Sequence, residues 1–275
     1  SGIEENMQED FRDSNLSHIL AVSGANVSYI IVSITYIFNK MCLRKRLSKI
    51  ISIILLILFM LLTGCTSSVN RACIMAILML IAELLYRKSD VYNNLAISAL
   101  ILLIINPYSL LDIGFQLSYM GTIGIVFLHD KIGNFIKINN KIVKYFFEMI
   151  AVTTCANLAI IPIMMFHFNT ISLTFYFSNI IVGPILGIVV IIGFIMFFIS
   201  LIFTPISSLI AIVLNLMLKF IIKIAEITAN MPFSKITIIT PSFFFIIVWY
   251  LIIISISYKQ KVKIFYHKNN KLIKK

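Results

Sequence analysis

The sequence is poor in charge, and this shortage bounds the class of protein. Only 12% of its 275 residues are Asp, Glu, Lys or Arg, whereas a soluble globular domain has about 25%. Acidic residues are the scarcer sign, 11 against 23 basic residues. Hydrophobic residues make up 60% of the chain and the mean hydropathy is +1.01. Because this apolar excess extends along the whole chain, it excludes a soluble domain with one anchor and indicates a multi-pass membrane protein.

Motifs of metal, nucleotide and nucleophile chemistry are also missing. The four cysteines form no CxxC pair and no zinc-like spacing with His, so we interpret them as small packing residues. HExxH, P-loop and GxGxxG patterns are absent. His18 and Ser23 are five residues apart, which gives poor same-face geometry on a helix, and Ser23 lacks the GxSxG frame. We therefore predict neither an enzyme nor a cofactor.

Long hydrophobic runs dominate what is present. A membrane-spanning helix needs about 20 mostly apolar residues, and the chain has about nine such segments. The predicted fold is an all-α polytopic transmembrane bundle with one more amphipathic helix at the membrane interface, over 132–147, where lysines alternate with apolar residues. The segments cover about 17–38, 50–68, 71–86, 91–105, 109–128, 148–166, 176–203, 206–227 and 241–258.

Three regions follow from this pattern. Residues 1–15 are polar and acidic, and we expect them outside the membrane, continuing an amino-terminal region that the sequence does not include, because the chain starts at Ser1 and shows no signal peptide. The transmembrane domain is predicted over 16–258. Residues 259–275 form a basic tail, which we expect in the cytoplasm.

The distribution of basic residues predicts the orientation. The net charge is +12, and 18 of the 23 Lys and Arg residues fall in the connections after the first, third and fifth segments and in the tail. If nine segments alternate, these all lie on one side. Cytoplasmic loops carry such an excess, so we predict a bacterial cytoplasmic membrane protein with its amino end outside and its carboxyl end in the cytoplasm.

Polar residues inside the apolar segments are the candidate functional residues, because hydrocarbon offers them no partners. They either join helices or line a hydrated path. Gly183 and Pro184 are a candidate hinge. Lys219, Lys223 and Glu226 share one helix face, which either lines water or sits at the outer headgroups. We also expect Glu83 to pair with Arg87. The pathway or helix-joining candidates are His18, Ser23, Asn26, Arg71, Gln116, Asn157 and Asn179.

Four stretches, in order, carry a resemblance to a known family. Residues 17–24, SHILAVSG, are followed by Asn70-Arg71-Ala72 with Met75, by Asn106-Pro107 with LDIGFQLSY at 111–119, and by FHFNTISLTFYFSNIIVGP at 166–184. Together they resemble the motifs of the ComEC-type competence proteins, the bacterial DNA-uptake channels. Asn26 is a departure, since the family motif usually has His at that position.

The resemblance implies a channel component for uptake of single-stranded DNA across the cytoplasmic membrane in natural transformation. Its partners would be the DNA strand, the lipid bilayer, a separate ATP-driven motor and a DNA receptor, with a homo-oligomer possible. Larger members add OB-like and metallo-β-lactamase-like domains, and no HxHxDH motif of the latter occurs here. Two alternatives remain open: a small-solute or ion transporter, and a non-conducting remnant with an assembly role.

Overall fold

A computed structural model describes residues 24–40, 44–133, 140–172, 174–200, 203–231, 234 and 236–255. Two predicted site residues, His18 and Ser23, lie outside the described residues. The predicted leader and basic tail, 1–15 and 259–275, lie outside them as well.

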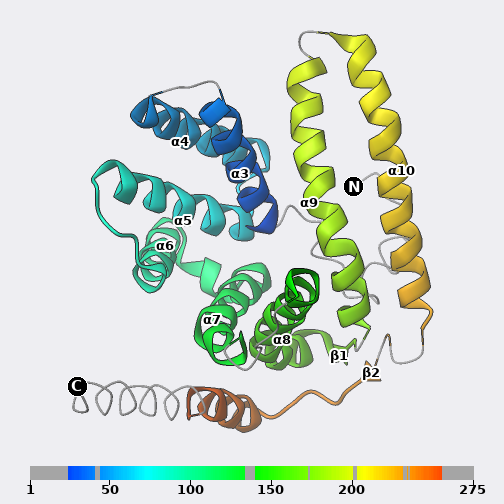
Figure 1. The fold of residues 1–275 in the computed structure, drawn as a ribbon. Helices are drawn as coiled ribbons and strands as arrows, with labels where there is room; N and C mark the ends of the chain where they lie inside the picture. The colour runs from blue at the N-terminus through cyan, green and yellow to red at the C-terminus, as the bar shows by residue number, and fades with distance from the viewer. Residues whose placement is uncertain are drawn as a thin grey trace, which may run out of the picture. The chain divides into compact units, whose positions relative to one another are not determined.

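The described chain is built almost entirely of helices (Figure 1). Two strands of two residues, β1 (Thr170–Ile171) and β2 (Ile236–Thr237), form a small sheet. A last apolar helix covers Phe243–Ser255. The other helices are α3 (Gly24–Lys40), α4 (Lys45–Leu62), α5 (Ser67–Leu84), α6 (Val91–Ile105), the 3-10 helix η1 (Pro107–Leu111), α7 (Ile113–Gly133), α8 (Lys141–Phe168), α9 (Phe175–Ser200) and α10 (Thr204–Ala229).

Several of these helices have the length and composition of membrane spans. Ser67–Leu84, Val143–Phe168, Tyr176–Ser200 and Thr204–Ala229 are long and apolar enough to cross a bilayer. Gly24–Phe38, Val91–Ile105, Ile113–His129 and Phe243–Ser255 are shorter apolar helices. The predicted class, a polytopic helical membrane protein, is confirmed.

Local chemistry explains where α6 begins and ends. The Asp90 carboxylate accepts a hydrogen bond from the backbone N–H of Tyr92 at 2.8 Å, which caps the first turn of α6. The helix ends before Asn106 and Pro107, because proline restricts the residue before it and cannot continue the helical hydrogen bonds. The sequence predicted this helix over 91–105, and the structure agrees.

The helices α4 and α8 differ from the expected segments. α4 ends at Leu62 instead of near residue 68, because Gly64 and Cys65 both adopt left-handed backbone with φ of 71° and 55°. Residues 141–147, expected in a separate interfacial helix, are instead the first turns of α8. They contain no glycine or proline, so helical hydrogen bonding continues through them into the apolar segment.

Two compact units make up the fold. The first contains α3 to α6, η1, the start of α7, α9 and α10. Within it, α9 and α10 run antiparallel side by side (Figure 1) and share a core. α3 approaches α9 closely at Gly187, where a Cβ atom would lie 2.9 Å from the Tyr29 ring. The core between α3, α4 and α5 consists of Val27, Leu56, Val69, Cys73, Ala76 and Leu80.

The second unit contains the rest of α7, α8 and the helix Phe243–Ser255. Pro162 lies inside α8 and is fully buried. Because proline has no N–H, the carbonyl of Leu158 loses its helical donor. The only tryptophan of the chain, Trp249, supplies a replacement, since its indole N–H donates to that carbonyl at 2.9 Å. Tyr250 donates to the next carbonyl, that of Ala159, also at 2.9 Å.

Candidate functional site

The start of α5 gathers the polar residues of the first unit. After the left-handed pair at Gly64 and Cys65, the chain turns back and α5 begins at Ser67. The Asn70 side chain donates to the carbonyl of Cys65 at 2.7 Å and so fastens the turn to the helix. The small polar run 64–70 therefore bends the backbone and places Ser67, Ser68 and Arg71 on the first turns of α5.

Asp112 joins α5 to α7. Its Oδ2 atom accepts a hydrogen bond from the backbone N–H of Phe115 at 3.0 Å, which caps the first turn of α7. The same oxygen accepts the Ser67 hydroxyl hydrogen bond at 2.5 Å. Gly114 leaves room for this contact, because a Cβ atom there would lie 3.0 Å from the Ser67 Oγ. One carboxylate thus links two helices that are 45 residues apart in sequence.

Arg71 extends the junction into the interior. Its side chain is buried, with 9% of the residue exposed, and its Nη1 donates to the backbone carbonyl of Ser118 at 2.8 Å. The Ser118 hydroxyl in turn donates to the Ser68 hydroxyl at 3.2 Å. A guanidinium is costly to bury in an apolar body unless polar groups surround it. Here the Ser118 carbonyl of α7 accepts a hydrogen bond from the guanidinium.

The first turn of α3 closes over this group. A Cβ atom on Gly24 would lie 2.8 Å from the Arg71 Nη2 and 3.3 Å from the Cβ of Ala72, so glycine permits α3 to pack directly on α5.

Two buried amide oxygens, Oδ1 of Asn26 and Oδ1 of Asn70, have no hydrogen-bond partner among the described residues. A buried acceptor without a donor costs about 1–3 kcal/mol, so both atoms favour a donor from solvent or from a bound solute.

We call this group the α3–α5–α7 junction; it consists of Gly24, Asn26, Ser67, Ser68, Asn70, Arg71, Asp112 and Ser118. Of the predicted site residues, it contains Asn26 and Arg71. Gln116 lies on the same first turns of α7, where its amide donates to the Leu110 carbonyl at 3.0 Å and holds η1 against α7.

The remaining predicted residues lie elsewhere. Asn157 is on α8 in the second unit, and its amide donates within the helix to the Thr153 carbonyl at 2.9 Å. Asn179 is on α9 and partly buried. α9 is helical without interruption through Gly183 and Pro184, and the hinge at these two residues stays a prediction.

Sequence reasoning did not single out Ser67, Ser68 or Gly24 individually. The available signal was their position, since the serines belong to the polar run that precedes the third apolar segment and Gly24 ends the first motif stretch. Their partners on α7 could not be identified from the sequence, because only the chain reversal between the helices brings them together.

The expected ion pair between Glu83 and Arg87 is wrong. Glu83 instead pairs with Lys49 of α4, with 3.0 Å between the Lys49 Nζ and the Glu83 Oε2. α5 ends at Leu84, and Tyr86 adopts left-handed backbone with φ of 55°, so Arg87 no longer follows the helical spacing that would bring it beside Glu83.

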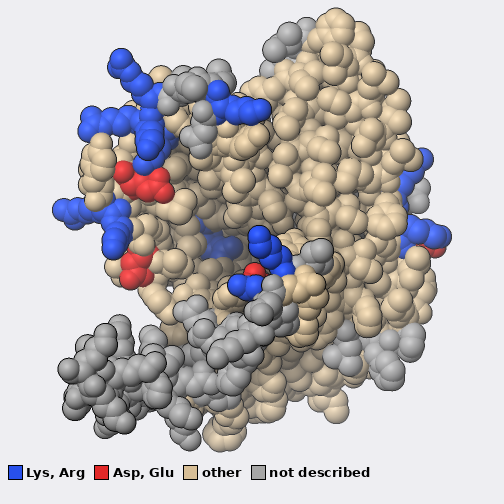
Figure 2. Space-filling view, viewed as in Figure 1, with Lys and Arg blue, Asp and Glu red and all other residues tan. Residues whose placement is uncertain are grey.

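This ion pair identifies a basic edge of the first unit. It joins the start of α4 to the end of α5, so the basic residues at 40–49 and those at 87–88 lie at the same end of these helices. Figure 2 shows Lys and Arg gathering over α4 and the α5–α6 connection, whereas most of the surface in this view is uncharged. The α3–α5–α7 junction lies at the other end of α5, about 24 Å away along the helix axis at 1.5 Å per residue.

No metal centre is found within the part of the chain that the structure describes: no group of three or more His, Cys, Asp or Glu side chains there could hold an ion. The junction instead combines one guanidinium, one carboxylate, and hydroxyl and amide groups.

Several described helices have spanning length, and a polar junction around the buried Arg71 connects α3, α5 and α7. These features define a multi-pass membrane protein with a polar contact between its helices. Comparison with known proteins then gives the family. The family model described as Competence protein matches residues 1–262, and the chain belongs to this family. The resemblance inferred from the four motif stretches is confirmed.

One relative that the chain matches is a longer protein. ComE operon protein 3 of Bacillus subtilis (strain 168) is 26% identical over 182 residues. The matched region covers 66% of this chain and 23% of that protein, so the chain corresponds to about a quarter of its length. No solved structure matches the chain.

Proposed function

We propose that this chain is the membrane channel component through which single-stranded DNA crosses the cytoplasmic membrane during natural transformation. The relative is named ComE operon protein 3, and the Competence protein family model spans nearly the whole chain. The observation that carries the proposal is the convergence of three motif stretches, at Gly24, Arg71 and Asp112, on one polar junction that contains a buried arginine.

The junction suits a path for a polyanion. Phosphate groups dominate the affinity of proteins for nucleic acid, and Arg is well suited to bind them. Arg71 is buried and donates to the Ser118 carbonyl, so it holds a positive charge inside an otherwise apolar body. Oxygen acceptors such as Asn26 Oδ1 and Asn70 Oδ1 complement the donors of water and of nucleobases, which differ from base to base.

The orientation follows from the basic edge. If the basic connections face the cytoplasm, the start of α5 lies toward the outer surface, where incoming DNA arrives. The amino end of the chain is then outside and its carboxyl end is in the cytoplasm. A reporter fused after Lys275 is expected to be active only if the reporter functions in the cytoplasm; activity of an exported reporter at this position contradicts the orientation.

The chain carries no nucleotide-binding motif, so strand movement requires an ATP-driven motor as a partner, and capture of DNA requires a receptor. We place no hydrolytic step in this chain. Whether it works as a homo-oligomer is addressed by its mass in detergent.

The proposal is tested by replacing Arg71. In cells that insert the variant at the normal level, Arg71→Ala is expected to lower uptake of labelled DNA by at least about tenfold, since one charge-assisted contact contributes about 1.5–3 kcal/mol. Arg71→Lys retains the charge and is expected to restore part of the uptake. Lys88→Gln, a change of an exposed cation at the basic edge, is the control and leaves uptake unchanged.

Deleting the gene separates the alternatives. Loss of labelled-DNA uptake supports the channel component, whereas normal uptake in the deletion strain refutes it and leaves the small-solute transporter and the assembly role. Unchanged uptake in both Arg71 variants refutes the role of the junction.

A further inference from the structure

The exposed polar residues of α10 fall on a single line along the helix. From Thr204 to Asn230, the positions of successive exposed polar residues differ by four, seven, four, four, three and four. At 100° per residue, this spacing confines them to an arc of about 100°. Pro205, Ile212 and Ile222 are the apolar residues in the same arc. We call the line the α10 polar stripe; its members are Thr204, Ser208, Asn215, Lys219, Lys223, Glu226 and Asn230.

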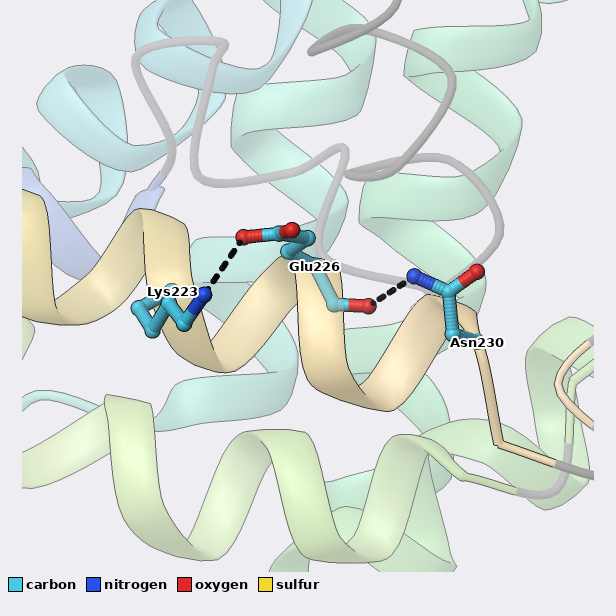
Figure 3. Close-up of polar contacts among 3 residues, drawn as sticks. All are labelled: Lys223, Glu226 and Asn230. Carbon is cyan, nitrogen blue, oxygen red and sulfur yellow. Dashed lines mark hydrogen bonds and ion pairs between the residues drawn. The ribbon is translucent and has the colours of Figure 1, made fainter.

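The stripe faces away from α9. The side of α10 that packs on α9 is apolar and buried, with Ile221, Ile224 and Ala225 against Val182. Figure 3 shows Glu226 and Asn230 projecting from the opposite side of α10. The buried side and the stripe therefore divide the helix into an apolar face within the unit and a polar face outside the α9–α10 pair.

The stripe has two lysines but one glutamate. Lys223 and Glu226 form an ion pair at 3.3 Å, with side chains 66% and 50% exposed. Asn230 donates to the Glu226 carbonyl at 2.9 Å and closes the helix end. Lys219 forms no ion pair among the described residues. The stripe thus carries one cation that is not neutralised by a carboxylate.

A surface position at the headgroups does not account for the whole stripe. α10 packs antiparallel along α9, which is the most apolar of the candidate spans, and both helices have 26 residues. A helix of this length is about 39 Å long and crosses the bilayer core of about 30 Å together with its neighbour. Lys219 is ten residues before the last helical residue, Ala229, hence about 15 Å from that end. Asn215 and Ser208 extend the stripe from Lys219 toward the start of α10.

Neither lipid nor a second copy of this chain is a suitable partner for the polar face of α10. Charged and amide groups facing hydrocarbon are costly. In a two-fold dimer within the membrane, the chains are parallel and Lys219 would face its own copy at the same depth. Helix pairs in membranes also prefer small residues at the contact, whereas this arc carries two lysines, a glutamate and two asparagines.

We infer that the α10 polar stripe is one wall of a water-filled path that carries the phosphodiester backbone of a single polynucleotide strand. The inference rests on the proposed function and names the surface that the strand contacts. Phosphate complements Lys219, hydroxyl and amide groups tolerate any base sequence, and the stripe runs the full length of a spanning helix. In the proposed orientation its lysines lie in the outer half, so they meet the incoming strand first.

Water access along the stripe is the first test. Ser208→Cys and Asn215→Cys are each made in the full chain, and their reaction with a charged thiol reagent is measured above the rate of the parent chain in native membranes. Val213→Cys is the matched control, since Val213 is 51% exposed at a similar depth but outside the polar arc. We expect both stripe positions to react at least about tenfold faster than the control. Equal, slow rates at all three positions overturn the inference.

The second test concerns the occupant. Added single-stranded oligonucleotide is expected to slow labelling of Asn215→Cys, and Lys219→Gln is expected to reduce DNA uptake by about tenfold, as for loss of one charged contact. Lys88→Gln again serves as the unchanged control. Labelling that is unaffected by oligonucleotide, together with normal uptake in Lys219→Gln, shows a water-exposed face that does not contact the strand and overturns the assignment.

The two proposals fail in different ways. If deletion of the gene abolishes uptake but the stripe is unreactive, the proposed function stands and the wall lies on another surface. If the stripe is reactive but deletion leaves uptake normal, the polynucleotide is the wrong occupant and the proposed function falls with it.

Discussion

The bond between Ser67 and Asp112 gives the most direct test of how the motif residues hold α5 and α7 together. The carboxylate accepts two hydrogen bonds on one oxygen, from the Ser67 hydroxyl at 2.5 Å and from the Phe115 backbone N–H at 3.0 Å. Asp112→Ala removes both, whereas Ser67→Ala removes only the contact between the helices. Comparing the two variants therefore separates the helix cap from the tertiary contact.

The magnitudes follow from the type of each bond. Loss of an N-cap costs about 0.5–2 kcal/mol, and a hydrogen bond to a charged group contributes about 1.5–3 kcal/mol. Because Asp112 is exposed, solvent replaces part of each bond, so we take the lower half of both ranges. We expect Asp112→Ala to lower the free energy of unfolding by about 2–3.5 kcal/mol and Ser67→Ala by about 1.5–2.3 kcal/mol.

The assay is a double-mutant cycle. Unfolding of the purified chain in detergent micelles is followed by loss of helical circular dichroism as sodium dodecyl sulfate is added, for the parent, both single variants and the double variant. We expect a coupling energy of about 1 kcal/mol between Ser67 and Asp112. Additivity within about 0.3 kcal/mol would falsify the direct contact.

Three further predictions concern packing and charge. Gly124→Ala should destabilise the second unit by about 1–3 kcal/mol, since the new Cβ would lie 2.7 Å from the Ala159 Cβ and would meet backbone as well. Gly193→Ala, whose Cβ would have nothing within 4 Å, should be neutral or stabilising by up to about 1 kcal/mol. Equal melting temperatures for the two variants contradict this prediction. Trp249→Phe should cost about 1–3 kcal/mol in the same unfolding assay, because the partly buried carbonyl of Leu158 loses its donor, and a parent-like stability refutes that role. Lys49→Gln should change stability by less than about 1 kcal/mol and lose even that effect in high salt, because its partner Glu83 is 47% exposed; a larger, salt-independent loss indicates a buried contribution.

The helix content and the family were predictable, because both depend on local features. Apolar runs of spanning length specify membrane helices without knowledge of their neighbours. The boundaries of α6 were predicted correctly because Asp90, Asn106 and Pro107 act on the nearest backbone groups. The motif stretches identified the family because they occur along this chain in the same order as the motifs of the family.

Partners across helices were not predictable in the same way. Arg71 and Gln116 could be named as polar residues in apolar segments, but the carbonyl of Ser118 that receives the Arg71 guanidinium lies 47 residues further along the chain. The Glu83 prediction failed for a related reason, since it assumed that helical spacing continues to Arg87, and the left-handed turn at Tyr86 ends it.

The sequence by itself determined that this is an apolar, all-helical membrane protein with polar residues at a few defined depths, since hydropathy, proline and left-handed glycine act within one or two turns. Only the tertiary structure decided that Gly24, Arg71 and Asp112 share one junction, that Trp249 replaces the hydrogen bond lost at Pro162, and that the polar face of α10 points away from α9. The physical reason is the same in each case: a polar group inside an apolar body must find a partner, and which partner it finds depends on how closely distant helices can approach.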